Sequence, residues 1–138
     1  MRNLQKAAAT VAALGIAFGV AGCVPDTKPN PVGMAVDQSL NLDLRNVATE
    51  LEAMGGSRGV TGYSIEMAPT KPGGAIDLGN GSNQNASPGN VIAVKVVENG
   101  KGYCVSGYNK SATKATSATK SLLYQSHKGG IQPGVGAC

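Results

Sequence analysis

A stripe of apolar residues at helical spacing limits the folds that this chain can adopt. Between residues 35 and 56 these positions recur at steps of three or four residues, which places them on one face of an α-helix. They are Val36, Leu40, Leu44, Val47, Leu51 and Met54. We expect Asp37 and Asp43 to complement the helix dipole near its start, and the glycine pair at 55–56 to end the helix. Because a single apolar face must be buried against a second layer, the helix should lie on a sheet.

Strand signals follow in the second half of the chain. The segment 90–97 is rich in β-branched residues, and 102–108 resumes the pattern after the Asn-Gly pair at 99–100, which favours the type I′ turn of a β-hairpin. We expect a third strand at 121–126, and Pro133 limits the segment after it to an edge strand or coil. The predicted fold class is α+β, with one amphipathic helix packed on a small antiparallel β-meander.

Two less regular segments lie between the helix and these strands. We expect a short strand at 60–67, where Tyr63, Ile65 and Met67 alternate with other residues. The next segment, 68–90, is dominated by Gly, Pro, Asn and Ser, which indicates a long exposed loop. Loops of that length in compact domains are usually functional or disordered, and the sequence leaves both open.

The first 22 residues have the pattern of an export signal. Arg2 and Lys6 give a basic start, and residues 7–21 are uncharged and rich in Ala, Val, Leu and Gly. These fifteen residues span about 22 Å as a helix, less than the hydrocarbon core of about 30 Å that a transmembrane helix crosses. The alternative is a short transmembrane or buried helix.

The residues that end this leader resemble the lipobox of bacterial lipoproteins. Val20 occupies its branched apolar position, the Ala-Gly pair its small positions, and Cys23 the acceptor position. In that family a diacylglyceryl group alkylates the cysteine, cleavage makes it the N-terminus, and acyl chains such as palmitate anchor the protein. The resemblance implies a lipid on Cys23 and a location at the outer membrane or the outer face of the cytoplasmic membrane. The alternative is ordinary secretion, with the Cys23 thiol free.

Three segments follow from this division. A signal peptide occupies 1–22, the lipidated cysteine and a proline-rich tether occupy 23–34, and one domain occupies 35–138. The tether should favour polyproline II, which extends about 3.1 Å per residue.

Two cysteines remain once Cys23 carries a lipid. They are Cys104 and Cys138, and an exported protein meets an oxidising compartment. We expect a disulfide between them, which would contribute about 4 kcal/mol on the chain-entropy model. The alternative is two unpaired thiols.

Basic residues are concentrated in the C-terminal third of the chain. Residues 91–138 hold six lysines against one acidic residue, Glu98, for a net charge of +5. We single out Lys110, Lys114 and Lys120 as a set that could bind a polyanion such as anionic lipid, an acidic wall polymer or DNA. The alternative is that these lysines are solvated and keep an exported protein soluble.

Three segments in this order resemble the globular head of type IV pilins and pseudopilins. Residues 43–53 resemble the end of the pilin helix, 100–108 the strand with the first cysteine, and 123–138 the closing segment with its terminal cysteine. The resemblance implies a pilin-head-like domain, with partners among envelope, pilus or secretion proteins and no nucleic acid. Where pilins carry a prepilin peptidase site and a long apolar stem with a glutamate, this sequence has a lipobox. The resemblance therefore does not imply a filament subunit, and it leaves an accessory role or an unrelated surface role open.

No set of residues indicates catalysis. His127 is the only histidine, so a metal pair or proton relay lacks a second imidazole. Glu50 and Glu52 lie two residues apart on the helix and should point to different faces, which separates them as an acid/base pair. We therefore expect no enzyme, no catalytic residue, no metal and no cofactor apart from the lipid on Cys23.

Two classes of function remain. The first is a membrane-anchored envelope lipoprotein with a non-catalytic, pilin-like interaction domain, accessory to a type IV pilus or secretion system. The second is a stand-alone surface lipoprotein that binds anionic wall polymer, lipid or DNA through its lysine-rich C-terminal half.

Overall fold

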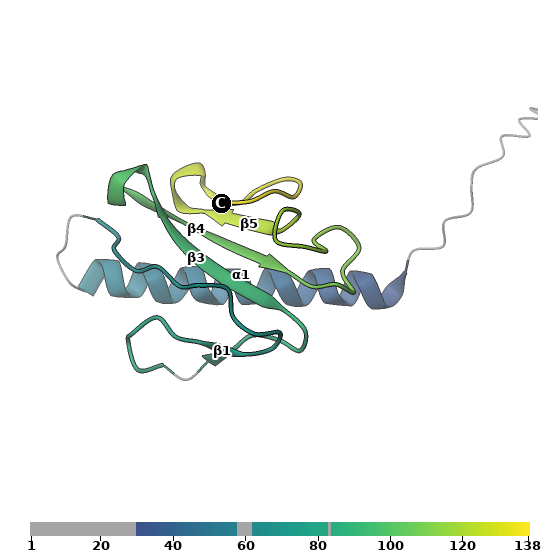
Figure 1. The fold of residues 1–138 in the computed structure, drawn as a ribbon. Helices are drawn as coiled ribbons and strands as arrows, with labels where there is room; N and C mark the ends of the chain where they lie inside the picture. The colour runs from purple at the N-terminus through teal and green to yellow at the C-terminus, as the bar shows by residue number, and fades with distance from the viewer. Residues whose placement is uncertain (1–29, 58–61, 83) are drawn as a thin grey trace, which may run out of the picture.

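A computed structural model describes residues 30–57, 62–82 and 84–138 of the chain. Within these residues a single helix, α1 (Pro31–Ser57), lies across a four-stranded antiparallel sheet of order β3-β4-β5-β6 (Figure 1). The strands are β3 (Val91–Val97), β4 (Gly102–Tyr108), β5 (Leu122–Gln125) and β6 (Gly130–Ile131). The smaller elements are the strand pair β1 (Ala75–Ile76) and β2 (Gln84–Asn85), and the short 3-10 turns η1 (Glu98–Gly100) and η2 (Ser126–Lys128). The predicted α+β class, one helix on an antiparallel meander, is confirmed.

The apolar face of α1 is buried in the core, as predicted. Its buried members are Leu40, Leu44, Val47, Leu51 and Met54, with Val36 half-buried beside them. The sheet supplies the opposite side of the core with Ile92, Val94, Tyr103 and Val105. Gly107 in β4 allows the two layers to approach, because a Cβ there would lie 2.5 Å from Leu44 Cδ1 and 2.9 Å from Ile92 Cδ1. A side chain at this point would require the ends of the Leu44 and Ile92 side chains, or the two layers, to shift.

The helix begins at Pro31, so the predicted boundary between tether and domain is wrong by four residues. Asn30 caps the helix: its Oδ1 accepts a hydrogen bond from the N–H of Val32 at 3.2 Å, and its carbonyl accepts from Met34 at 3.0 Å. Proline suits the first helical position because its missing N–H would have no partner there. Residues 31–34, predicted as tether, therefore belong to the helix.

The predicted end of the helix is also wrong, because α1 continues through the glycine pair to Ser57. Gly55 lets the Tyr63 ring come close, since a Cβ on Gly55 would lie 3.1 Å from Tyr63 Cε1. No acidic residue lies in the first turn, so the predicted dipole role of Asp37 and Asp43 is wrong as well. Both carboxylates instead accept hydrogen bonds from loops that pack on the helix.

The β3–β4 hairpin has the predicted turn. Asn99 and Gly100 adopt left-handed φ angles of 55° and 88°, and the N–H of Lys101 donates to the carbonyl of Glu98 at 3.2 Å. These features define a type I′ turn. The third predicted strand is β5, and β6 is the short edge strand that precedes Pro133.

The segment before the long loop lies along β3, but it is not a full strand. Met67 exchanges two backbone hydrogen bonds of 3.0 Å with Val94, and the N–H of Tyr63 donates to the carbonyl of Gly100 at 2.6 Å. In place of the predicted strand at 60–67, the structure has a single β-bridge at Met67, preceded by residues that run along β3. Residues 60 and 61 lie outside the described residues.

The predicted exposed loop at 68–90 is partly buried. It contains the β1–β2 ribbon, and Ile76, Leu78 and Ala86 belong to the hydrophobic core. These apolar residues are isolated among glycines and polar residues, so they show no period from which their burial could be predicted. Figure 1 shows the ribbon on the side of α1 away from β5.

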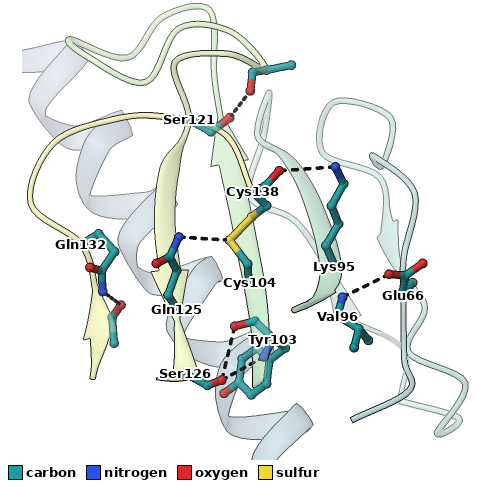
Figure 2. Close-up of a disulfide and its surroundings, with 12 residues drawn as sticks. Glu66, Lys95, Val96, Tyr103, Cys104, Ser121, Gln125, Ser126, Gln132 and Cys138 are labelled. Carbon is teal, nitrogen blue, oxygen red and sulfur yellow. Dashed lines mark hydrogen bonds between the residues drawn. A yellow bond between two sulfur atoms is a disulfide. The ribbon is translucent and has the colours of Figure 1, made fainter. Parts of the chain in front are cut away.

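The predicted disulfide between Cys104 and Cys138 is present, with a Cα–Cα distance of 5.8 Å. Side chains alternate along β4, so Tyr103 and Val105 face α1 while Cys104 faces the other side of the sheet. Figure 2 shows the bond in front of β4, with Lys95 Nζ 3.4 Å from the main-chain oxygen of Cys138. The last residues of the chain are thereby held over the face of the sheet that α1 does not cover.

Candidate functional site

The predicted site residues fall into separate places. Cys23 lies outside the described residues, and the two other cysteines form the disulfide. Lys110, Lys114 and Lys120 all lie on the β4–β5 loop, and all three side chains are exposed. The lysines are therefore the predicted residues that the structure brings to one accessible segment.

The β4–β5 loop is ordered by its own hydrogen bonds and by α1. The N–H of Asn109 donates to the carbonyl of Ala115 at 2.8 Å, and Asn109 Oδ1 accepts from the N–H of Ser111 at 2.9 Å. The Asp37 carboxylate accepts from both the N–H and the hydroxyl of Thr113. These contacts fix the middle of the loop, and with it Lys114, beside the first half of the helix.

A hollow of about 400 Å³ opens where this loop, α1 and the C-terminal segment meet. Its lining is Met34, Asp37, Asn41, Thr113, Lys114, Ala115, Leu122, Gly134 and Val135. A second, shallower hollow adjoins it, because Asp37 and Asn41 line both, and Leu42 forms its far side. The two hollows thus adjoin each other along the N-terminal half of α1, and we call them together the depression.

Three of the four exposed large apolar side chains of the described residues line these hollows. Met34 is 49% exposed, Leu42 61% and Val135 42%, whereas Val32, which is 64% exposed, lines neither hollow. We call Met34, Leu42 and Val135, together with Lys114, the proximal surface, because Met34 lies in the first turn of the helix. Sequence analysis found the lysine but not the apolar members, which come from separate segments and meet only in the folded domain.

A buried polar cluster joins α1 to the loops that pack on it. Asp43 is buried and accepts hydrogen bonds from Ser87 N–H at 2.8 Å, Ser87 Oγ at 2.9 Å and Asn90 Nδ2 at 2.8 Å. The fully buried Asn90 in turn accepts from Asn109 Nδ2 at 2.8 Å. The cluster links α1, the segment before β3 and the β4–β5 loop, so its role is to hold these three together. Asp43 lies three residues after Leu40 and four before Val47, and this place on the apolar face was the signal that it needed a buried partner.

Two tyrosines share one carboxylate at the other end of the helix. Tyr63 donates to Glu52 Oε2 at 2.7 Å, and the fully buried Tyr103 donates to Glu52 Oε1 at 2.9 Å. The hydrogen bond to Glu52, and then burial, raise the pKa of Tyr63 to about 12. Burial first, and then the same carboxylate, raise the pKa of Tyr103 further. Both phenols stay protonated donors at neutral pH, so they stabilise the fold and do not act as bases.

The remaining titratable candidates are held apart. Glu50 accepts from Asn80 Nδ2 at 2.9 Å and from Gln84 Nε2 at 3.0 Å, so it faces the β1–β2 ribbon while Glu52 faces the tyrosines. The predicted separation of these two glutamates is confirmed. The exposed His127 has its Nε2 3.9 Å from Glu98 Oε1, at the turn end of the hairpin.

Within residues 30–57, 62–82 and 84–138, no group of three or more His, Cys, Asp or Glu side chains could hold a metal ion. The same residues include no helix with the length and apolar character needed to cross a membrane. No protein-family model matches the chain, and neither the curated proteins nor the solved structures contain a match.

Proposed function

We propose that this protein is a bacterial envelope lipoprotein, anchored through Cys23, whose domain is a non-catalytic interaction module. The observation that carries the proposal is the position of the domain relative to the lipobox-like sequence. Val20-Ala21-Gly22-Cys23 ends an apolar leader, and Asn30, the residue that caps α1, lies seven positions after Cys23. Seven residues reach at most about 25 Å, so the lipid would hold the domain close to a bilayer. Each buried methylene of an acyl chain contributes about 0.8 kcal/mol, and two or more chains anchor durably.

The order of elements supports a pilin-head-like domain. A long helix packs on an antiparallel meander, and a disulfide joins β4 to the C-terminal residue. This is the arrangement that the resemblance of residues 43–53, 100–108 and 123–138 implies. Since a lipobox stands in place of the filament stem, the proposed role is accessory to a type IV pilus or secretion system.

The engagement of two carboxylates, the buried Asp43 and the exposed Glu52, supports a non-catalytic role. Asp43 is occupied by three hydrogen bonds from Ser87 and Asn90, and Glu52 by two tyrosine hydroxyls. These are the groups that a hydrolytic site would need free. The domain would therefore act by contact.

The exposed lysines favour a second candidate. Lys110, Lys114 and Lys120 lie on one ordered loop, where they can meet a polyanion without rearrangement. A stand-alone lipoprotein that binds anionic wall polymer, lipid or DNA through this loop is the alternative. Two results would favour this alternative: binding to a polyanion is lost at high salt, and it is also lost when these three lysines are replaced by glutamine.

A Cys23→Ser variant in the native host tests the anchor. The wild-type protein should partition with membranes and resist extraction by salt and alkaline carbonate. The variant should lose the lipid and accumulate as uncleaved precursor. If the variant is processed and located as the wild type is, Cys23 is not the lipid acceptor and the proposal is wrong.

A second readout of the same strain tests the accessory role. Loss of surface pili or of a secreted protein in the Cys23→Ser strain, restored by the wild-type gene, would support it. Unchanged piliation and secretion would leave the stand-alone lipoprotein as the better account.

A further inference from the structure

We propose that the proximal surface lies against the anionic phospholipid bilayer that holds the acyl chains, so that the anchor and the surface together set the orientation of the domain. The proposal rests on the proposed lipid on Cys23. It adds a second membrane contact, made by side chains of the folded domain, and names anionic phospholipid as its ligand.

The apolar side of the contact comes from the proximal surface itself. Met34 and Val135 both line the hollow of about 400 Å³, and Leu42 borders the adjoining one. Apolar side chains grouped in this way can enter the boundary between headgroups and acyl chains, as those of interfacial helices do.

Basic side chains border the same depression. Lys114 lines the hollow of about 400 Å³, and Lys110 lies on the same loop. Arg45 donates from Nε to Asn41 Oδ1 at 2.9 Å, which places its guanidinium beside one of the two residues that both hollows share. The acidic residue of the depression, Asp37, is engaged by the backbone and hydroxyl of Thr113. The surface therefore complements anionic headgroups, which attract lysine and arginine near a membrane.

Because of the tether, the proximal surface needs only a weak affinity for the bilayer to orient the domain. Six residues lie between Cys23 and Asn30, and the seven residue steps that join the two reach about 25 Å at most. This length holds the first turn of α1 at a high effective concentration near the bilayer, so the surface needs little affinity of its own. A longer tether would leave the domain free to turn away.

At the opposite end of the domain, none of the described residues is an exposed large apolar side chain. Tyr63 packs against Gly55 near the end of α1 and also binds Gly100, which places the η1 turn and Lys101 at that end. Figure 1 shows the β3–β4 turn at the left and the start of α1 at the right. Lys101 is therefore a matched control, since it is exposed but remote from the tether.

A tryptophan reporter can test the orientation because the chain contains no tryptophan. Lipidated Val135→Trp and Lys101→Trp proteins would be placed in vesicles of phosphatidylcholine with one quarter phosphatidylglycerol, both brominated in the acyl chains. We expect severalfold stronger quenching of fluorescence at position 135 than at position 101. Leu42→Trp provides a second reporter in case the first variant does not fold, with the intact disulfide as the check on folding.

Charge variants then test the headgroup contact. Lys110→Gln with Lys114→Gln should lower the quenching at position 135 toward that at position 101, whereas Lys101→Gln should leave it unchanged. Salt that shortens the Debye length from about 10 Å to about 3 Å should act as the double variant does. In vesicles of phosphatidylcholine alone, the quenching at position 135 should be weaker than in vesicles that contain phosphatidylglycerol.

Each contrary outcome has a distinct meaning. If the protein floats with the vesicles but positions 42, 101 and 135 are quenched equally, the anchor stands and the membrane-facing surface is wrong. If the protein carries no lipid and does not float, the proposed function itself fails. If the lysine variants lose binding to a DNA fragment or to polyphosphate while position 135 stays unquenched, the loop serves a soluble polymer, and the proposal is overturned.

Discussion

The side-chain amide of Asn90 donates a hydrogen bond of 2.8 Å to the Asp43 carboxylate, in the interior between α1 and the start of β3. An aspartate at this place on the apolar face would be costly without partners, because desolvation disfavours its charge. The partners come from a segment more than forty residues away. The helix and the long loop therefore depend on each other for stability.

Replacement of Asp43 by alanine should destabilise the domain strongly. The change removes the side-chain acceptor of the Ser87 N–H and one of the two acceptors of Asn90 Nδ2, which keeps Ser39 Oγ at 3.2 Å, and we expect a loss of about 3 kcal/mol. Urea unfolding followed by circular dichroism measures it. Asp77→Ala is the matched control, because Asp77 is exposed and accepts a hydrogen bond from the N–H of Gly79, and it should cost less than about 1 kcal/mol. Equal losses in the two variants would mean that the buried cluster is not a special source of stability.

Alanine at position 107 should force the helix and the sheet apart. The added methyl would lie 2.5 Å from Leu44 Cδ1 and 2.9 Å from Ile92 Cδ1, and overpacking of this kind costs about 1–3 kcal/mol. The free energy of unfolding is again the readout. At Gly136 a Cβ would meet Leu123 Cδ1 at 3.4 Å, an ordinary contact, so Gly136→Ala should have little effect. A Gly107→Ala protein as stable as the wild type would contradict the close packing of α1 on β4.

Removal of the disulfide should lower stability without changing the fold. Cys104 and Cys138 are 34 residues apart, and closing a loop of that length contributes about 4 kcal/mol on the chain-entropy model. The Cys104→Ala, Cys138→Ala double variant should therefore unfold at a lower urea concentration, and reductant should have the same effect on the wild type. If reductant leaves the wild-type midpoint unchanged, the bond contributes nothing to stability.

The stability of the domain should fall at high pH through Tyr63. Its pKa is raised from 10.0 to about 12, so the unfolded chain releases this proton first as the pH rises. The stabilisation is complete below pH 10 and is lost between pH 10 and about pH 12. Glu52→Gln removes the main cause of the shift, and tyrosinate absorbance should then appear at lower pH.

Glu50→Gln controls for this experiment, because it makes the same change of charge two residues away on α1. Glu50 accepts from Asn80 and Gln84 rather than from a tyrosine, so the titration of the tyrosines should match that of the wild type. An identical titration in the Glu52→Gln protein would exclude the shared carboxylate as the cause.

Periodic features of the sequence predicted most of the fold. The apolar stripe from Val36 to Met54, the β-branched segments and the Asn-Gly pair each have a local physical cause, so the helix, sheet and turn followed. The start of α1 could not be predicted from the sequence, because an Asn-Pro pair suits both a tether and a helix start. The burial of Ile76 and Leu78 did not follow either, since it depends on distant contacts with the core.

The candidate site likewise contains residues that could be predicted from the sequence and residues that could not. Lys110, Lys114 and Lys120 could be found from the uneven charge of the chain. The apolar members of the proximal surface could not, because Met34, Leu42 and Val135 are ordinary residues in sequence. They become a feature only where Asp37 binds Thr113 and brings the helix, the loop and the C-terminal segment together.

The intact mass of the protein extracted from membranes of its native host tests the central claim most directly. A lipid on Cys23 predicts the mass of residues 23–138 plus a diacylglyceryl group and its acyl chains, with two thiols that become alkylated only after reduction. A product without added lipid, or one cut at another residue, would contradict the claim that this domain is held to a membrane through Cys23.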